Sequence, residues 1–388
     1  MKIDRLEPAS RFSSTASGGM YSSFFLNSML IYLVYCAVNE GYIKGRGAQI
    51  KTANRFLASQ YTTDHIEGLD EQLQDVPQTQ VFHENPKKIV NKITSPDLGF
   101  GYSMNPYQGC EHGCIYCYAR NTHEYYGFSA GLDFETKIIV KQNAPELLER
   151  HLLQPSWNAV PIMLSGNTDC YQPQEQKLKI TRRMLEVLLK YQHPVGIITK
   201  NGLIQRDIDI LQDLAKANLV NVMISVTTLN ESLRRMMEPR TASGIKRMET
   251  IEALSKAGIP TGVMSAPIIP GLNHHEIPDI YKVAAAHGAV ACGMTVVRLN
   301  GSIGKIFEDW LRKNFPDRFE KVWNQISDLH GGNVNDSVFG RRMAGEGNIA
   351  SAIHQLYRIA KKKYFTGKAM PPMDLTRFRK GGNLNLFS

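Results

Sequence analysis

The chain has 388 residues, of which 43% are hydrophobic and 21% charged. This is the composition of a globular protein and excludes a mainly disordered or fibrous chain. Lysine and arginine outnumber aspartate and glutamate by 45 to 36, and the resulting net charge of +9 favours an anionic partner. The six cysteines are too few for a disulfide scaffold, so their spacing carries the information.

The N-terminal extension, residues 1–42, differs from the rest of the chain. Its run Met20–Val38 is mostly apolar, and as a helix it would span about 28 Å, just short of the roughly 30 Å hydrocarbon core of a bilayer. A signal peptide fits poorly, because Asp4 and Glu7 dilute the basic start and no small-residue cleavage site follows. We expect residues 1–42 to be an irregular leader, or upstream sequence included by a wrong start codon. A membrane anchor is the alternative. The protein as a whole is expected to be cytoplasmic.

The next two segments differ in their periodicity. Residues 43–99 are polar and turn-rich, and we expect an extended approach segment. Residues 100–300 alternate apolar runs with amphipathic stretches, and this alternation predicts βαβ units and a parallel sheet. The expected strands are 103–108, 161–166, 195–200, 220–227, 260–268 and 289–298, and the expected helices are 177–190, 207–217, 244–257 and 275–287. We therefore predict an α/β fold, a partial (β/α)6 barrel of the TIM type, with its chemistry at the C-terminal ends of the strands. Residues 301–388 should form a helical region with a basic C-terminal tail.

Three cysteines, Cys110, Cys114 and Cys117, stand close together in GCEHGCIYCYAR. At this spacing one short loop, made pliable by Gly109 and Gly113, can present three thiolates to one inorganic centre. A structural zinc ion usually takes four ligands as two separated pairs, and no second pair follows here. A [4Fe–4S] cluster held by three cysteines leaves one iron open to a substrate, which fits the spacing better.

The cysteine motif stands in a context that resembles a known family. Together with SPDLGFGYSMNPYQ, LDFETKIIVK, SGNTDCYQP, ISVTTL and MEPRTAS, it resembles the radical S-adenosylmethionine (radical SAM) superfamily and its spore photoproduct lyase-related branch, over about Ile43–Leu311. The resemblance implies a [4Fe–4S] cluster whose open iron chelates the amino and carboxylate groups of S-adenosylmethionine. It also implies one-electron cleavage of that cofactor, loss of methionine, and hydrogen abstraction by a 5′-deoxyadenosyl radical from a substrate in the barrel mouth.

The resemblance further implies cofactor-binding positions. Tyr116, between the last two cysteines, stands where the superfamily places a residue against the adenine, with ordinary aromatic packing as the alternative. Six further candidates lie at or beyond strand ends; they are Gly166, Asn167, Thr168, Lys200, Ser225 and Arg240. The first three match the place where the methionyl amino group binds, although a plain turn would use the same residues. A lysine or arginine can neutralise the cofactor carboxylate, and a surface salt bridge is the alternative.

One position departs from spore photoproduct lyase. That enzyme carries on its second strand a cysteine that quenches the product radical, and Gly166 stands at the matching position here. Cys170 and Cys292 are the remaining candidates for such a thiol, although a buried free cysteine is the commoner case. Reversal of thymine dimers by the same route is therefore not implied.

The C-terminal tail, residues 341–388, holds ten Lys/Arg and two Asp/Glu, a net charge of 10 − 2 = +8. Aromatic residues are interleaved with the charges, as phosphate neutralisation with base stacking requires; a solvated face is the alternative. The end of the chain, Asn383–Phe387, resembles the short peptides with which bacterial proteins bind the DNA sliding clamp.

These patterns predict a radical SAM enzyme that acts on a substrate such as a nucleic acid, in DNA repair or nucleic-acid modification, with an unidentified electron donor. Two other classes stay open. A non-catalytic iron–sulfur protein would only transfer electrons, but it would usually ligate all four irons. A zinc-dependent nucleic-acid-binding module would need His112 or His123 as a fourth ligand.

Overall fold

The computed structural model describes residues 42–57 and 78–380, and the described residues from Ile43 onward belong to one compact unit. The apolar run Met20–Val38 and the clamp-like peptide Asn383–Phe387 lie outside the described residues. Within the described residues, no helix is both long and apolar enough to cross a membrane.

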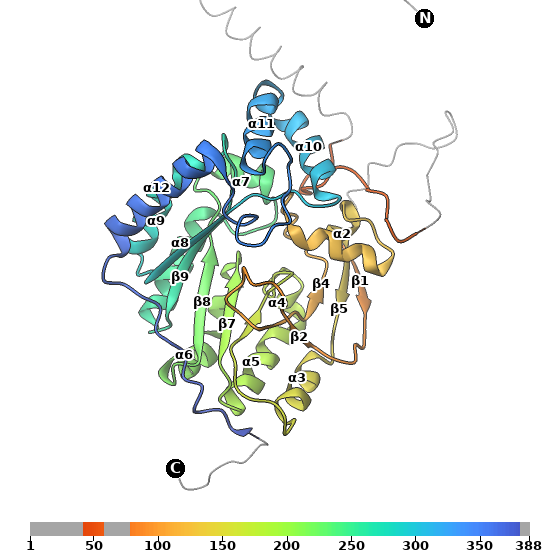
Figure 1. The fold of residues 1–388 in the computed structure, drawn as a ribbon. Helices are drawn as coiled ribbons and strands as arrows, with labels where there is room; N and C mark the ends of the chain where they lie inside the picture. The colour runs from red at the N-terminus through yellow and green to blue at the C-terminus, as the bar shows by residue number, and fades with distance from the viewer. Residues whose placement is uncertain (1–41, 58–77, 381–388) are drawn as a thin grey trace, which may run out of the picture. The chain divides into compact units, whose positions relative to one another are not determined.

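A seven-stranded sheet forms the centre of this unit (Figure 1), in the order β10-β9-β8-β7-β6-β3-β2. Its strands are β2 (Val90–Lys92), β3 (Tyr102–Met104), β6 (Ile162–Leu164), β7 (Val195–Thr199), β8 (Val220–Ser225), β9 (Thr261–Ile268) and β10 (Ala291–Val296). All neighbours from β3 to β10 pair in parallel, whereas β2 pairs antiparallel with β3 at one edge. The expected α/β fold with a parallel sheet is therefore confirmed, and among the described strands no pairing joins β10 to β2 to close a barrel.

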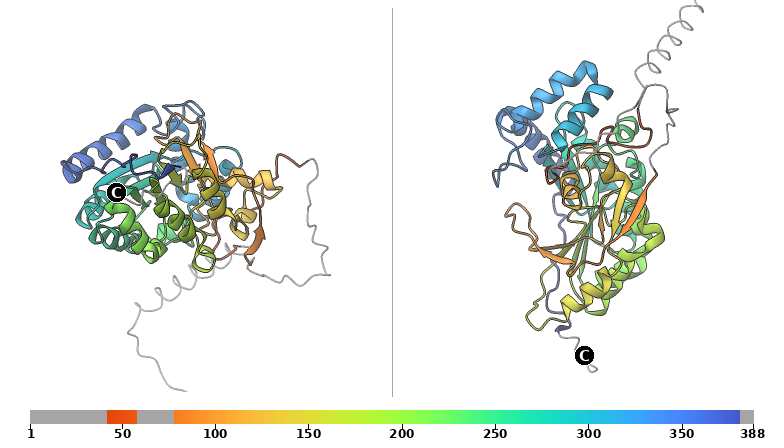
Figure 2. Two further views of the ribbon diagram at one scale, coloured as in Figure 1. Left: turned by 90° about the horizontal axis from the view of Figure 1, so that it is seen from below. Right: turned by 90° about the vertical axis from the view of Figure 1, so that its right-hand side faces the viewer.

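Apolar side chains on one face of this sheet form the main core with the connecting helices. Registered pairs such as Ile197 with Val222 and Ile224 with Val263 place fully buried residues on that face. The helices that follow the strands are α5 (Ile180–Lys190), α6 (Ile208–Lys216), α8 (Gly244–Lys256) and α9 (Ile277–Ala286). The view from below in Figure 2 shows them along the outside of the sheet. This arrangement leaves the C-terminal ends of the strands free for a site.

Two expected elements are divided in the structure. The strand expected at 103–108 stops at Met104, and Pro106, which has no amide hydrogen to donate, precedes a separate strand β4 (Tyr107–Gln108). Strand β4 pairs with β5 (Lys137–Val140), which pairs in turn with β1 (Gln80–His83) in a second sheet. The helix expected at 177–190 is broken at Lys179, whose φ of 53° is left-handed; α4 (Glu175–Leu178) precedes the break.

The C-terminal region is helical, as expected. It contains α10 (Ile303–Asn314), α11 (Phe319–Leu329) and α12 (Gly347–Phe365). Trp310 of α10 donates from its indole nitrogen to the carbonyl of Met236 at 3.0 Å, in a second core that includes the cysteine loop. Helix α12 lies beside α9 on the outside of the molecule (Figure 1).

The remaining short helices connect these layers. They are η1 (Tyr118–Tyr126), α2 (Leu132–Thr136), α3 (Ala144–Leu152), η2 (Gly202–Asp207), α7 (Glu231–Met237), η3 (His274–Glu276) and η4 (Pro316–Arg318). Of these, η1 and α2 follow the cysteine loop directly, and α7 follows β8. Backbone hydrogen bonds join the cysteine loop to α2 and to α7.

Candidate metal and cofactor site

The cysteine loop, residues 109–117, is held by backbone hydrogen bonds from two sides. The amide of Cys110 donates to the carbonyl of Phe134 in α2 at 2.8 Å, and the amide of Ile115 donates to the carbonyl of Met237 in α7 at 3.1 Å. Gly113 has a φ of 68°, which lets the chain turn between the cysteines. Cys110 and Cys114 are buried, and Cys117 is half-buried.

Polar side chains tie the same loop to the ends of β6 and β7. Gln172 donates from Nε2 to the carbonyl of Gly109 at 3.1 Å and accepts the amide hydrogen of Glu111 at 3.1 Å. His112 places Nδ1 3.4 Å from Oδ2 of Asp169, and the same carboxylate oxygen accepts the amide hydrogen of Lys200 at 2.8 Å. The loop is therefore fixed against the strand ends where the chemistry was expected.

The three thiols suit an iron–sulfur cluster in their chemistry. Burial raises the pKa of all three thiols. Cys117 packs in one apolar cluster with Cys114 and in another with Cys110. Soft thiolate ligands select iron–sulfur clusters as well as zinc. In the part of the chain that the structure describes, no three His, Cys, Asp or Glu groups converge on a single metal ion. A cube does not require such convergence, because each cysteine binds a different iron.

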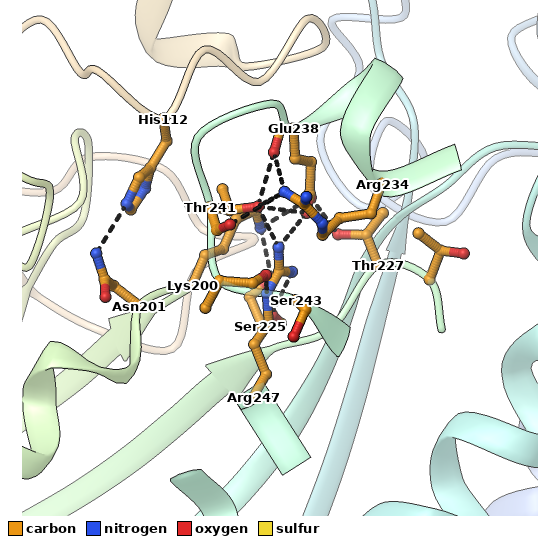
Figure 3. Close-up of polar contacts among 12 residues, drawn as sticks. His112, Lys200, Asn201, Ser225, Thr227, Arg234, Glu238, Thr241, Ser243 and Arg247 are labelled. Carbon is orange, nitrogen blue, oxygen red and sulfur yellow. Dashed lines mark hydrogen bonds and ion pairs between the residues drawn. The ribbon is translucent and has the colours of Figure 1, made fainter. Parts of the chain in front are cut away.

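The two histidines considered as fourth ligands have other surroundings. The Nε2 atom of His112 lies 3.3 Å from Nδ2 of Asn201 (Figure 3), and its Nδ1 faces Asp169. His123 packs against Phe128 and Phe134, and burial lowers its pKa to about 4. The ring of His112 is thus held by polar partners, whereas both ring nitrogens of the buried His123 lack a hydrogen-bond partner among the described residues.

A fully buried carboxylate, Glu238, organises the polar group beside the loop (Figure 3). It accepts hydrogen bonds from Tyr116, from Arg247 and, at 2.6 Å, from the hydroxyl of Thr227. The Nζ atom of Lys200 lies 3.9 Å from Oε1 of Glu238. Burial alone would raise the pKa of Glu238, but Arg247 and Lys200 outweigh it and hold the pKa at about 2. The carboxylate is thus ionised and satisfied by its partners.

The structure brings three of the expected cofactor-binding residues together around Glu238. Lys200 donates to the hydroxyl of Ser225 at 2.5 Å, and its ammonium lies 5.9 Å from the centre of the Tyr116 ring. Lys200 follows β7, Ser225 ends β8 and Tyr116 lies in the cysteine loop. A lysine held in this way can bind a carboxylate beside the cysteines.

The residues after β6 form a second, neighbouring group. The carbonyl of Gly166 accepts a hydrogen bond from Tyr118 at 2.7 Å, and Asn167 donates to Oε1 of Gln108 at 3.1 Å. Thr168 is buried and donates to the carbonyl of Tyr107 at 2.6 Å. The side chains at positions 167 and 168 are therefore engaged within the protein, and the carbonyl of the half-buried Gly166 is engaged by Tyr118.

Arg240 lies apart from the group around Glu238. Its Nη1 atom is 3.6 Å from Glu111 in the cysteine loop, and its backbone amide donates to the carbonyl of His112 at 3.3 Å. The contacts of Arg240 are therefore with the loop itself.

Of the two cysteines considered as hydrogen donors, one lies in the main core and the other, half-buried, packs against it. Cys170 is fully buried there. Cys292 pairs in register with the buried Val263 and therefore shares its face of the sheet, towards α12 and Lys361. Packing accounts for both residues.

Residues that single-sequence reasoning missed complete the site. Glu238 and Arg247 meet although nine positions separate them, and the one signal was that Glu238 is the glutamate of the MEPR motif. Tyr118 follows the last cysteine and reaches Gly166. The buried pair Arg120 and Glu135 contacts the loop through the carbonyl of Cys114. No periodic pattern in the sequence indicates that these two residues pair.

Comparison with known proteins agrees with this geometry. The model of the radical SAM superfamily matches residues 104–284, which contain the cysteine loop, Lys200 and Glu238. The chain is 34% identical over 240 residues to an uncharacterised protein of Mycobacterium tuberculosis (strain ATCC 25618 / H37Rv), a match that covers 61% of this chain and 71% of the relative. It is also 25% identical over 280 residues to the radical SAM Nalpha-GlyT isomerase of Pseudomonas phage M6, covering 71% of this chain and 54% of that protein.

Among solved structures, the chain has the fold of spore photoproduct lyase. A double mutant of that enzyme with bound AdoMet and dinucleoside spore photoproduct superposes with a TM-score of 0.55 at 14% sequence identity. The superposition covers 74% of this chain and 79% of the enzyme. It shows a shared fold that extends well beyond the residues matched by the family model.

Proposed function

The chain belongs to the radical SAM superfamily, whose members use a [4Fe–4S] cluster and S-adenosylmethionine, and we propose that it is an enzyme that abstracts hydrogen from a nucleic acid. One observation carries the proposal. The three-cysteine loop lies against the C-terminal strand ends that hold Lys200 and Ser225. The reaction belongs to nucleic-acid modification or DNA repair.

The residues of the site have separate tasks in this proposal. Cys110, Cys114 and Cys117 would hold the cluster. Bound together, cluster and cofactor would supply the one-electron chemistry that allows hydrogen abstraction. The Lys200 ammonium, fixed by Ser225 and Glu238, would neutralise the carboxylate of the cofactor. The carbonyl of Gly166, which already accepts from Tyr118, would accept a second hydrogen bond from the cofactor's amino group. Apolar residues of α10 and α11 pack in one cluster with Cys114 and Tyr116 and would limit the access of water from that side.

Two features support a nucleic acid as the substrate. The fold is that of an enzyme solved with a dinucleoside photoproduct. Helix α12 contains no acidic residue, and on its surface three cationic side chains share a shallow cavity of about 290 Å³ with Phe365 and Thr366; they are Arg358, Lys361 and Lys362. Clustered cationic side chains suit a phosphate backbone, whereas the ring of Phe365 is buried in the main core. Contact of Asn383–Phe387 with a sliding clamp and a cytoplasmic location are further parts of the proposal.

The first experiment separates the enzyme from the two other classes of protein. Anaerobic reconstitution of the purified chain should give iron and sulfide in equal amounts, close to four of each per chain, as a [4Fe–4S] cluster requires. The Cys114→Ala variant should hold much less of both. Zinc without sulfide would identify a zinc-binding module instead. A cluster that transfers electrons but never binds S-adenosylmethionine would identify an electron carrier.

The second experiment tests the substrate class. Reconstituted, reduced protein is incubated with S-adenosylmethionine and a mixture of deuterated DNA and RNA fragments, and 5′-deoxyadenosine is analysed by mass spectrometry. Hydrogen abstraction from a nucleic acid should place deuterium in the 5′-deoxyadenosine. If deuterium enters it only from deuterated peptides or a small metabolite in parallel incubations, the nucleic-acid part of the proposal is wrong.

A further inference from the structure

The segment Gly45–Ala48, here called the strap, lies directly against the cysteine loop. At Gly47 an added Cβ would stand 1.7 Å from the carbonyl oxygen of Gly113, the residue before Cys114. No side chain fits in that space, because real Cβ contacts below 3.0 Å essentially do not occur. The strap therefore touches the loop backbone to backbone. It also precedes residues 104–284, which the family model matches.

A buried ion pair joins the strap to Cys114 by a second route. The carboxylate of Glu135 accepts the amide hydrogens of Gly47 at 3.0 Å and Ala48 at 2.8 Å. The same carboxylate accepts from Nη2 of Arg120 at 2.5 Å, and Nε of Arg120 donates to the carbonyl of Cys114 at 2.9 Å. Both charged side chains are fully buried. A pair buried in this way is costly to break, because either partner alone would be an uncompensated charge.

The contacts enclose the loop between the strap and the ion pair. A Cβ at Gly113 would meet Oε2 of Glu135 at 2.7 Å on one side and Pro239 at 3.2 Å on another. The turn before Cys114 therefore has little room to move while the strap is in place. Loop, strap and ion pair act as one unit.

From these contacts we propose that the strap, with Glu135 and Arg120, is a positioning element of the cluster site: it holds the cysteine loop in the conformation that binds the [4Fe–4S] cluster. The inference rests on the proposed function in one respect, since it treats the three cysteines as cluster ligands. Gly47 is a positioning residue that acts through Gly113 and Glu135. The cluster site accordingly extends beyond the residues that carry the superfamily motif.

The first test uses the cluster-free chain and so does not depend on the proposed function. Alkylation of Cys114 by iodoacetamide is followed by peptide mass spectrometry in Gly47→Ala and in Gly99→Ala, a control whose added Cβ meets nothing within 4 Å. Loss of the strap contact should speed alkylation of Cys114 at least tenfold in Gly47→Ala only. Cys292, on β10, should react at an unchanged rate in both. Equal rates for Cys114 in the two variants would overturn the proposal.

The second test asks whether the same contact supports the cluster. After reconstitution, loss of iron to a chelator and the midpoint potential of the cluster are compared in the two variants. Gly47→Ala should lose iron at least tenfold faster and shift the potential, whereas Gly99→Ala should match the parent chain. Faster alkylation with unchanged iron loss would show a purely structural strap and would also overturn the proposal. A parent chain that binds no cluster would refute the proposed function, while the alkylation result would still decide whether the strap holds the loop.

If Gly47→Ala does not fold, Glu135→Gln provides the same two readouts. The variant keeps the size of the side chain, but its amide group places a donor where the strap amides and Arg120 all need an acceptor. Faster alkylation and faster iron loss are expected again. Parent-like values for both would contradict the role of the ion pair.

Discussion

Glu238 illustrates how one buried side chain arranges several others. A carboxylate without partners is costly to bury, yet here it meets Arg247, Lys200, Tyr116 and the hydroxyl of Thr227. Each of these partners is held in one orientation in return. The ammonium of Lys200 is thereby placed beside the cysteine loop. It lies 3.9 Å from the carboxylate of Glu238, which is longer than a direct hydrogen bond, so it can still bind a second anion.

The position of Lys200 predicts a specific binding defect. In Lys200→Met the charged partner of the cofactor carboxylate is lost, and a charge-assisted hydrogen bond contributes about 1.5–3 kcal/mol. The dissociation constant of S-adenosylmethionine should therefore rise about tenfold to a hundredfold, as measured by equilibrium binding to the reconstituted protein. The control is Lys216→Met, which removes an exposed lysine paired with Asp213 on α6. Equal affinities in the two variants would rule out this role for Lys200.

Gly166 gives a second prediction at the scale of single residues. A Cβ at this position would lie 2.8 Å from Cβ of Ser103 on β3, so Gly166→Ala should strain the junction of β3 and β6. We expect the free energy of unfolding to fall by about 1–3 kcal/mol, as for other overpacked sites. The double variant Gly166→Ala/Ser103→Gly should recover most of the loss in urea unfolding. Failure of the second substitution to restore stability would show that this contact is not the cause.

At the scale of elements, the regular parts of the fold could be predicted because their signals are local. The strands expected at 195–200, 220–227 and 260–268 coincide with β7, β8 and β9 to within two residues, since continuous apolar runs mark strands covered by helices. The cysteine loop was visible because its three thiols lie within eight residues. In contrast, the break at Lys179 depends on one left-handed residue within an otherwise helical pattern.

Contacts made by loops could not be predicted in this way. The strap consists of small and polar residues without periodicity. Its role depends on the contact between Gly47 and the carbonyl of Gly113, which lies 66 positions later. The pair Arg120 and Glu135 likewise follows from the packing of η1 against α2. A single sequence shows that such residues are present, but only the folded chain shows which of them meet.

The base of the sheet carries an element-scale prediction about pH. His193 is buried, accepts a hydrogen bond from the indole of Trp157 at 3.1 Å and lies against Phe378. Burial lowers its pKa from 6.5 to about 4. Above pH 6.5 both the folded and the unfolded chain are neutral at this site. Between pH 6.5 and 4 only the unfolded chain takes up the proton, so stability falls by up to about 1.4 kcal/mol per pH unit.

The variant His193→Asn isolates this contribution, because its amide oxygen can still accept from Trp157 but does not titrate in this range. Urea unfolding measured between pH 7 and 4.5 should show a shallower loss of stability for the variant than for the parent chain. The buried His123, whose pKa is also about 4, is present in both and cancels in the difference. Parallel pH profiles would contradict the assignment to His193.

At the scale of the whole molecule, the cationic surface of α12 should bind phosphates. Replacing Arg358, Lys361 and Lys362 together by glutamine should flatten the log–log dependence of nucleic-acid affinity on salt by about 2–3, because each phosphate contact contributes about 0.7–0.9. The control removes the same charge from Lys216, Lys246 and Lys256, which pair with carboxylates on their own helices. If the slope of log affinity against log salt concentration falls equally in both triple variants, the binding reflects net charge and not this surface.

Reductive cleavage of S-adenosylmethionine tests the central claim most directly. Anaerobically reconstituted chain is mixed with dithionite and S-adenosylmethionine, and 5′-deoxyadenosine and methionine are measured by chromatography. The account predicts equal amounts of both products from the parent chain and from Cys292→Ala, whose thiol faces the main core. It predicts none above background from Cys114→Ala. A parent chain that holds its cluster and still forms no 5′-deoxyadenosine, or a Cys114→Ala variant that forms as much as the parent, would contradict it.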